Sequence, residues 1–361
     1  PMGVGINFVI NGKDYVIPMV TEEPSVVAAC SNAAKMARPG GGFTTDYTGS
    51  VMISQIQLLD VPAPFYAKGK ILENKEKIAE ICNARDPMLV KLGGGVKDVE
   101  VRVLDSLVGP MVVVHLLVDT GDAMGANAVN TMAEAVAPFL EELTGGRAEL
   151  RILSNLADHR IARARAVFKK DAIGGEEVVD KMIAAYAFAA ADPYRAATNN
   201  KGIMNGIIPV VIATGNDTRA IESGAHAYAA RSGQYSPFAT WEKNADGDLV
   251  GSIEMPMAVG LVGGATKIHP AAKVAVKMLG VKTAGELAQI IAAVGLAQNM
   301  AAMRALATEG IQRGHMSLHA RNLAATAGAT GELLEKIVKQ MVSEKNVRLE
   351  YAQELVKQYQ K

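Results

Sequence analysis

Three neighbouring stretches decide the predicted fold: DVEVRVL at residues 98–104, PMVVVHLLV at residues 110–118 and GANAVNTMAEAVAPFLEEL at residues 125–143. The first two are short, rich in Val and Leu, and follow the break at residues 93–95, which predicts two consecutive β-strands. The third is closed by Gly145 and Gly146 and carries apolar residues at helical spacing, which predicts a long α-helix.

The segments on either side complete the order of elements. Residues 51–59 predict a strand and residues 68–84 a helix before these stretches, and residues 148–153 predict a strand after them. Residues 50–154 therefore predict strand, helix, strand, strand, helix, strand, which is the split βαβ order of ferredoxin-like folds.

The rest of the chain is predicted to be mostly helical. Asn11 and Gly12 are suited to the two-residue turn of a β-hairpin over residues 7–20, and an Ala-rich helix follows over residues 24–38. A capping box at residues 283–286 begins a helix that runs to residue 309. Further helices are predicted over residues 178–191, 219–228, 270–278 and 332–360, and strands over residues 206–213 and on both sides of residues 244–247.

Charge and composition exclude several classes of protein. The 361 residues include 37 Lys and Arg and 37 Asp and Glu, a balance that argues against a nucleic-acid-binding protein and against polybasic attachment to a membrane. Hydrophobic residues make up 49% of the chain and charged residues 20%, so the chain can bury a large core and is not expected to be disordered.

Cysteine usage and apolar stretches predict a cytoplasmic protein. Cys30 and Cys82 lie outside any CxxC pair, which predicts neither a disulfide framework nor a zinc site. The longest apolar stretches, residues 111–118 and 207–213, are shorter than the roughly 20 residues that cross a bilayer. No signal peptide is visible, and because the chain begins at Pro1 without a Met, we expect an N-terminal segment to be missing.

Several common catalytic motifs are absent from the sequence. It contains no P-loop, GxSxG elbow, HExxH or GxGxxG motif, so P-loop phosphate transfer, serine hydrolysis, zinc proteolysis and a standard Rossmann site are unsupported. His315 and His319 are spaced to share one helical face. Because no third ligand lies nearby in the sequence, they favour a catalytic histidine beside a structural one over a metal site.

The stretch NNKGIMNG at residues 199–206 places one lysine among three amides, directly before an apolar run. The simplest interpretation is a solvated turn with Lys201 on the surface. The functional alternative is that the chain returns after the apolar run and brings Asp217 to Lys201. A paired, partly buried lysine keeps its charge and can stabilise an oxyanion.

Two predicted helix starts also allow a structural and a functional interpretation. Glu22 and Glu23 precede the helix at residue 24, where an acidic group complements the helix dipole, or where a carboxyl group in a cleft donates a proton. DAMGAN at residues 122–127 opens the long helix, and a small helix N-terminus of this kind can receive a pyrophosphate. Taken alone the second pattern is weak, because many helices begin with Asp and Gly.

Five motifs in this order carry a family resemblance: EEPS (22–25), DAMGAN (122–127), DPYRAATNNKGIMNG (192–206), GND (215–217) and GHM (314–316). Together they resemble the soluble class II 3-hydroxy-3-methylglutaryl-coenzyme A (HMG-CoA) reductases, from residue 1 to the C-terminus. The resemblance implies that the chain reduces HMG-CoA to mevalonate and CoA with two hydrides from a nicotinamide cofactor, or runs the reverse reaction.

The resemblance also implies roles for particular residues. The catalytic set falls on Glu23, Lys201, Asp217 and His315. The residues implied to bind the hydroxymethylglutaryl group are Ser25, Arg195, Thr198 and Asn205. Those implied to bind the dinucleotide are Asp86, Asp122, Met124, Gly125, Ala126, Asn127 and Asn155, and no metal is expected.

The implied architecture is α+β. A large helix-rich substrate domain (residues 1–49 and 155–313) carries an inserted ferredoxin-like dinucleotide-binding domain (residues 50–154) and a mobile C-terminal helical flap (residues 314–361). The family's sites form between subunits, so the resemblance implies a homodimer or higher homo-oligomer, with neither nucleic acid nor membrane as a partner.

The implied mechanism assigns a task to each catalytic residue. Lys201, oriented by Asp217, stabilises the thioester oxygen as it becomes anionic. His315 protonates the departing CoA thiolate, because histidine titrates near neutral pH. Glu23 donates the proton that the second reduction requires.

Two departures from the family pattern bear on these expectations. The N-terminal segment with a Glu-Asn-Val-Ile-Gly motif is absent, which predicts a truncated or partly ordered form. Asp86 favours NADH, because a carboxylate accepts both ribose hydroxyls and repels a 2′-phosphate, whereas the adjacent Arg85 could pair with that phosphate of NADPH. The alternatives in function are another acyl-CoA reductase of the same architecture and a non-catalytic assembly protein that keeps the fold.

Overall fold

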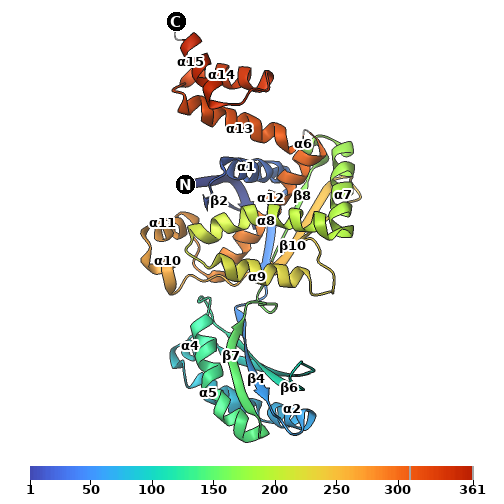
Figure 1. The fold of residues 1–361 in the computed structure, drawn as a ribbon, viewed down its shortest axis with the longest axis vertical. Coiled ribbons are helices and arrows are strands. Elements are labelled where there is room, and N and C mark those ends of the chain that lie inside the picture. Colours follow the sequence, from blue (N-terminus) through green and yellow to red (C-terminus); the bar gives the residue numbers. More distant parts are fainter. Residues whose placement is uncertain (309, 360–361) are drawn as a thin grey trace.

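The computed structural model describes residues 1–308 and 310–359, and for residues 311–318 it describes the backbone alone. Figure 1 shows three tiers along the long axis: a lower lobe around β4, β6 and β7, a middle lobe in which helices surround a second sheet, and the C-terminal helices. The lower lobe is inserted into the middle lobe, because its elements lie between β3 and β8 in the chain.

The middle lobe is built on a six-stranded sheet in the order β2-β1-β3-β8-β10-β9. The predicted hairpin is confirmed: β1 and β2 pair antiparallel, and Asn11 and Gly12 adopt φ values of 49° and 77° at the turn. The two central strands, β3 and β8, were not predicted. The strands are β1 (Met2–Ile10), β2 (Lys13–Val20), β3 (Phe43–Tyr47), β8 (Ile161–Phe168), β9 (Ala239–Lys243) and β10 (Leu249–Pro256).

A central helix, α12, packs against β3, β8 and β10 of this sheet and against the helices α1 and α8. Residues 290–300 of α12 are all buried. Among the described residues, α12 is the helix long and apolar enough to cross a membrane, but 67% of its most apolar stretch is buried inside the protein. The middle-lobe helices are α1 (Pro24–Ala37), the 3₁₀ helix η1 (Arg38–Gly40), α6 (Lys170–Ile173), α7 (Glu176–Ala191), α8 (Pro193–Ala213), α9 (Thr218–Ala229), α10 (Gly264–Ile268), α11 (Pro270–Leu279) and α12 (Ala284–Ala307).

The strand predicted over residues 206–213 is wrong, because these residues form the last turns of α8. A short apolar run has the same pattern in a buried strand and in a buried helix, so the sequence could not distinguish them. Asn199 and Asn200, expected in a solvated turn, lie within the same helix and are only 5% and 0% exposed.

The lower lobe confirms the ferredoxin-like order. Its four strands are arranged β5-β6-β4-β7, and all neighbours are antiparallel. The helix predicted over residues 68–84 is divided at Asn74 into two helices. The elements are β4 (Val51–Leu59), α2 (Pro64–Glu73), α3 (Lys75–Asn83), α4 (Pro87–Lys91), β5 (Gly95–Leu104), β6 (Met111–Asp119), α5 (Ala126–Thr144) and β7 (Arg147–Ser154).

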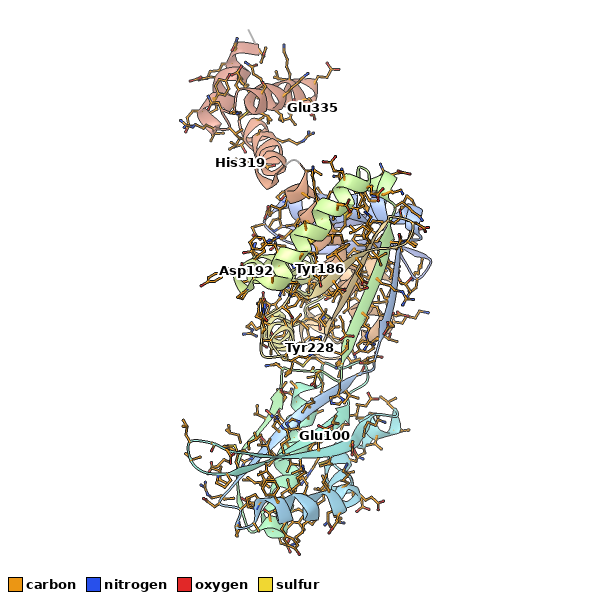
Figure 2. All side chains as sticks on the ribbon, turned by 90° about the vertical axis from the view of Figure 1, so that its right-hand side faces the viewer. Glu100, Tyr186, Asp192, Tyr228, His319 and Glu335 are labelled. Carbon is orange, nitrogen blue, oxygen red and sulfur yellow. The ribbon has the colours of Figure 1, made fainter. Side chains whose placement is uncertain are left out.

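The C-terminal helices form a small separate core of their own. Ala320, Ala324, Ile337, Met341 and Leu355 are buried in it, apart from the main core. Figure 2 shows this group, with His319 and Glu335 labelled, projecting beyond the middle lobe. Its helices are α13 (Ile311–Thr326), α14 (Gly331–Ser343) and α15 (Leu349–Tyr359). The domain boundaries proposed at residues 50, 155 and 314 stay a prediction.

Candidate functional site

The first candidate site is a cavity of about 540 Å³ between α1, α8 and α12, here called the helix cavity. Its lining combines residues from two motifs that lie far apart in the sequence. All the predicted substrate-binding residues and two of the predicted catalytic residues line it: Glu23, Ser25, Arg195, Thr198, Lys201 and Asn205.

The register of α8 explains why four of these residues face one cavity. Arg195, Thr198, Lys201 and Asn205 follow one another at spacings of three or four residues, which places them on one face of a helix. Asp192, labelled in Figure 2, caps this helix by accepting a hydrogen bond from the backbone N–H of Arg195 at 3.0 Å.

A second wall of the cavity begins at the first turn of α1. Pro24 occupies the first helical position, where a missing N–H costs nothing, and Glu23 is the residue that precedes it. The Ser25 hydroxyl donates a hydrogen bond to Glu23 Oε1 at 2.6 Å, which orients the carboxylate at the cavity.

A chain of buried amides forms part of the wall of the helix cavity and was not predicted. Asn299 Nδ2 donates to Asn199 Oδ1 at 3.0 Å, and Trp241 Nε1 donates to Asn299 Oδ1 at 2.7 Å. Next to it, the buried thiol of Cys30 contacts Gln298 Oε1 at 2.9 Å. Two adjacent amides in the otherwise apolar α12 were the available sequence signal, because buried amides require partners.

The second candidate site is a cavity of about 600 Å³ between the lobes, here called the interlobe cavity. The lower lobe contributes five of the predicted dinucleotide-binding residues to its lining: Asp86, Met124, Gly125, Ala126 and Asn127. The middle lobe contributes Gly215, Asn216, Asp217 and Gly260, among others. The cavity therefore exists only where the two lobes meet.

Two glycines permit the close approach of backbones in this cavity. Gly125, directly before α5, has φ of 96°, and a Cβ at this position would lie 2.3 Å from Thr120 Cγ2. A Cβ on Gly260 would lie 2.5 Å from the backbone N of Met124. The N-terminus of the 19-residue helix α5 thus borders the cavity, and its first residues there, Gly125 and Ala126, have little or no side chain.

The remaining predicted dinucleotide-binding residues lie outside the lining of this cavity. The Asp122 carboxylate accepts a hydrogen bond from the N–H of Ala284 at 2.7 Å, so it connects the loop before α5 to the start of α12. Asn155 is exposed, in the segment that follows β7. Within one chain, neither side chain therefore lines the interlobe cavity.

Within one chain, Lys201 and Asp217 line different cavities. The expected return of the chain does not occur, because the segment between them continues as helix and carries the chain roughly 18 Å from Lys201 to the end of α8 at 1.5 Å per residue. Asp217 instead caps α9 through the N–H groups of Arg219 and Ala220, at 2.9 and 3.3 Å. Partial burial acts to raise the pKa of Asp217, but the hydrogen bonds from Arg219 and from these N–H groups hold it below its usual range.

The predicted catalytic His315 lies outside the described side chains, so the structure does not place its imidazole. His319 is described and exposed on α13. Among the residues that the structure describes, no three His, Cys, Asp or Glu side chains gather where they could hold a metal ion.

Comparison with known proteins identifies the family of the chain. The family model for hydroxymethylglutaryl-coenzyme A reductase matches residues 1–320. The chain belongs to the hydroxymethylglutaryl-coenzyme A reductase family.

Relatives of this HMG-CoA reductase family member support the assignment over most of the chain. It is 64% identical to the HMG-CoA reductase of Archaeoglobus fulgidus, over 99% of this chain and 81% of that protein. A solved HMG-CoA reductase of Streptococcus pneumoniae superimposes with a TM-score of 0.85 at 43% identity, covering 99% of this chain and 86% of that chain. A class II enzyme from the same organism, solved bound to NADPH in open conformations, superimposes with a TM-score of 0.84 at 42% identity, over 100% of this chain and 88% of that chain.

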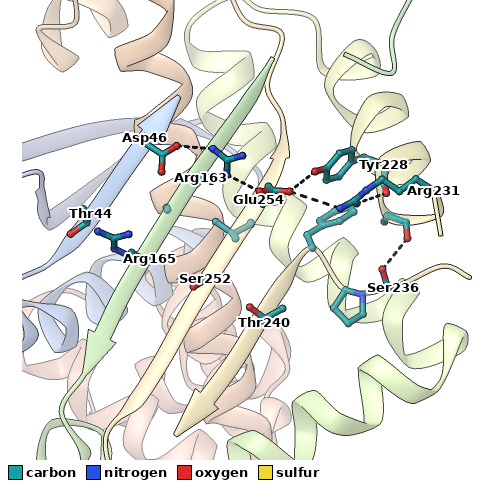
Figure 3. A pocket seen from close by; sticks show the side chains of 15 residues that line it. Thr44, Asp46, Arg163, Arg165, Tyr228, Arg231, Ser236, Thr240, Ser252 and Glu254 are labelled. Atoms are coloured by element: carbon teal, nitrogen blue, oxygen red, sulfur yellow. Dashed lines mark hydrogen bonds and ion pairs between the residues drawn. The ribbon is translucent and has the colours of Figure 1, made fainter. Parts of the chain in front are cut away.

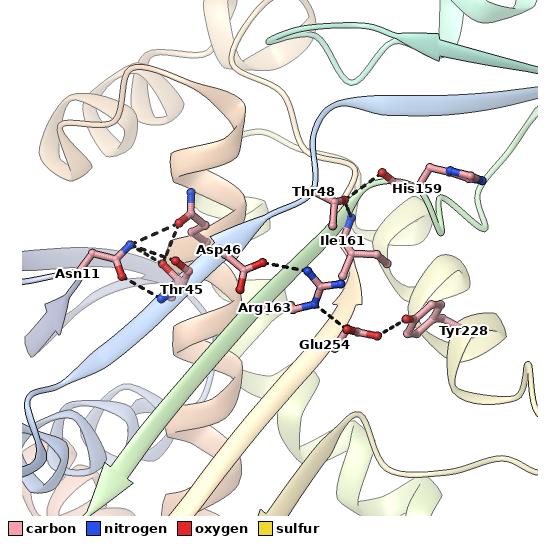
Figure 4. A network of polar contacts seen from close by, with 10 residues as sticks. Asn11, Thr45, Asp46, Thr48, His159, Ile161, Arg163, Tyr228 and Glu254 are labelled. Carbon is pink, nitrogen blue, oxygen red and sulfur yellow. Dashed lines mark hydrogen bonds and ion pairs between the residues drawn. The ribbon is translucent and has the colours of Figure 1, made fainter. Parts of the chain in front are cut away.

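A third cavity of this family member, of about 480 Å³, opens on the outer face of the six-stranded sheet. Figures 3 and 4 show Arg163 between Asp46 and Glu254, to which it donates at 2.9 and 2.6 Å. The Tyr228 hydroxyl also donates to Glu254, and burial together with this bond raises the pKa of Tyr228 to about 12. No motif predicted these residues, because they come from four elements that meet only in the fold.

The amide chain in the wall of the helix cavity generates a stability prediction. Asn299→Leu removes the partners of the Trp241 indole N–H and of Asn199 Oδ1, so we expect the free energy of unfolding to fall by about 2–5 kcal/mol. Denaturant unfolding followed by fluorescence measures it directly, because Trp241 is the single tryptophan of the chain.

The matched control is Asn32→Ala, at an exposed position of the same cavity, which is expected to change stability by less than about 0.5 kcal/mol. Equal effects of the two substitutions would show that the buried amides do not stabilise the site.

Proposed function

We propose that this chain reduces the thioester of HMG-CoA to mevalonate and CoA, using two hydrides from a nicotinamide dinucleotide. The observation that carries the proposal is the helix cavity, where an acid, two cations and three neutral hydrogen-bonding side chains meet. These are Glu23, Lys201, Arg195, Ser25, Thr198 and Asn205. Such a set suits a substrate with a carboxylate, a hydroxyl and a reactive carbonyl.

Lys201 is the residue we assign to the reacting oxygen. Hydride addition turns the thioester carbonyl into an oxyanion, and a cation already in place there contributes roughly 3–4 kcal/mol of transition-state stabilisation, by analogy with oxyanion-hole deletions. Arg195, on the same face of α8, is left to bind the terminal carboxylate, for which its planar guanidinium is suited.

The interlobe cavity fits the dinucleotide. A nicotinamide dinucleotide, when bound, supplies the hydrides. The α5 N-terminus and the small residues Gly125 and Ala126 can receive its pyrophosphate, since the first N–H groups of a helix have no intrahelical acceptor. Asp86 lines the same cavity and keeps its place by capping α4, where it accepts from the N–H of Leu89 at 2.9 Å.

A second copy of the chain would complete the site. Lys201 and Asp217 lie in different cavities of one chain, but a two-fold related copy can bring the interlobe cavity of one subunit against the helix cavity of the other. Asp217, held anionic by its hydrogen bonds, would then orient Lys201 from across the interface. We therefore propose a homodimer as the smallest active form.

The proton donors follow from the same arrangement. Glu23, at the wall of the helix cavity, is placed to protonate the oxygen formed in the second reduction. His315 is proposed to protonate the CoA thiolate, and it lies on α13, the helix that joins the C-terminal helices to the site. The two free, buried cysteines support a cytoplasmic enzyme.

The first prediction concerns Lys201. Lys201→Ala should lower kcat about 10²–10³-fold, because the oxyanion loses its preorganised cation, while the fold is retained. The loss of nicotinamide absorbance after addition of HMG-CoA measures it. Lys282→Ala, at an exposed lysine outside the cavity, is the control. Unchanged turnover of Lys201→Ala would exclude Lys201 as the cation at the oxyanion, and turnover in neither wild type nor Lys201→Ala would favour the non-catalytic alternative.

The second prediction tests the shared site. Lys201→Ala and Asp217→Asn chains, each inactive alone, should recover about a quarter of the wild-type activity when co-assembled at equal amounts, because half of the dimers are mixed and one of their two sites is intact. Lys201→Ala with Glu23→Gln is the matched control, because both residues belong to the same cavity of one chain and no intact site can form. Recovery in neither mixture would mean that the site is not shared in this way.

The third prediction concerns cofactor choice, for which we propose NADH. Asp86→Asn keeps the cap on α4 but removes the negative charge that would repel a 2′-phosphate. We expect the preference for NADH over NADPH, as a ratio of kcat/KM values, to fall about tenfold, which is ~1.4 kcal/mol. Asp60→Asn, an exposed aspartate of the same lobe, is the control, and an unchanged ratio for Asp86→Asn would exclude Asp86 as the selecting residue.

A further inference from the structure

Arg160 is a fully buried cation at the junction of the two lobes. It lies in the segment between β7 and β8, and its side chain is 0% exposed. Close to it, the two covalent connections between the lobes are tied together by Thr48, whose hydroxyl donates to the carbonyl of His159 at 3.0 Å and accepts from the N–H of Ile161 at 2.9 Å (Figure 4). No mechanism described above uses Arg160.

The guanidinium of Arg160 binds the loop that precedes α5. Its Nη1 donates to the carbonyls of Ala123 and Met124 at 3.1 and 3.2 Å and to Thr120 Oγ1 at 3.1 Å. Ala123 and Met124 line the interlobe cavity, and the next residue, Gly125, begins the turn into α5. A trans peptide directs its N–H opposite to its carbonyl, so the bond to Met124 turns the N–H of Gly125 away from Arg160.

The same guanidinium also binds the opposite lobe. Nη2 donates to the carbonyl of Val259 at 2.5 Å, and Nε donates to the Tyr47 hydroxyl at 2.7 Å. Val259 precedes Gly260, the cavity residue whose missing Cβ allows the contact with Met124. One side chain thus fixes a backbone segment on each wall of the interlobe cavity.

We propose that Arg160 is a positioning residue for the dinucleotide. By holding the carbonyls of Ala123, Met124 and Val259 on one guanidinium, it sets the distance between the two walls of the interlobe cavity and the direction of the α5 N-terminus. The proposal rests on the assignment of that cavity to the dinucleotide. It does not require Arg160 to touch the dinucleotide or the reacting atoms.

The test asks whether variants of the Arg160 contacts weaken binding of the dinucleotide while the KM for HMG-CoA and kcat stay unchanged. Tyr47→Phe and Thr120→Val each remove one partner of Arg160 with little change of shape, and Arg160→Lys keeps the charge but loses the fork of donors. We expect the Kd of NADH, followed by the fluorescence of the bound reduced nicotinamide, to rise about tenfold in each variant. The KM for HMG-CoA and kcat at saturating NADH should stay within twofold of wild type.

Two controls make the outcomes distinguishable. Arg163→Lys, on β8 and outside the cavity, should leave the Kd of NADH unchanged, whereas Ala126→Trp should fill the cavity and abolish binding. If Ala126→Trp does not weaken binding, the cavity is not the dinucleotide site and the proposal fails with that assignment. If Ala126→Trp abolishes binding but Tyr47→Phe and Thr120→Val bind NADH as wild type does, Arg160 has no positioning role. This conclusion holds even if Arg160→Lys fails to fold, because it rests on the other two variants. A parallel rise in the KM for HMG-CoA would likewise overturn it.

Discussion

The hydrogen bonds of the buried Arg160 guanidinium join backbone segments of both lobes at their junction. A charge in a dry interior is tolerated only when its donors are satisfied, and here the acceptors are carbonyls and hydroxyls from both lobes. The guanidinium would lose acceptors if either lobe were absent. Ala123 and Met124, whose carbonyls accept from Arg160, line the interlobe cavity, and Val259 directly precedes Gly260 on its other wall.

The second constraint is the continuity of α8. A rigid helix carries Arg195, Thr198, Lys201 and Asn205 on one face and then delivers the chain to Asp217 at the far end. The same rigidity that aligns these four residues keeps Asp217 away from them within one chain. The site that we propose to be shared between two subunits has a physical reason in this fold, because the helix that would build one half of the site separates it from the other half.

Local chemistry allowed much of the fold to be predicted. The Asn11-Gly12 turn has the positive φ values that those residues favour, and Thr283 caps α12 by accepting from the N–H of Glu286 at 3.1 Å, as the capping box requires. The ferredoxin-like order of the lower lobe was also predicted, since its strands and helices alternate with clear boundaries. Residues 206–213 were assigned to the wrong class, because a buried apolar run shows no alternation of apolar and polar residues. The strands β3 and β8 were missed although both alternate buried and more exposed residues, because β3 is only five residues long and the inward residues of β8 are mostly alanines, which are depleted in strands.

The sequence by itself determined the family, the order of elements in the lower lobe and the residue types of the helix cavity, because these depend on short motifs whose chemistry is local. The tertiary structure alone decided which of those residues share a cavity, that Asp122 joins a loop to α12, and which groups the buried Arg160 and Asn299 side chains bind. These features depend on which distant backbone groups meet in the core. The sequence does not reveal which of those groups will form hydrogen bonds with a buried arginine or asparagine.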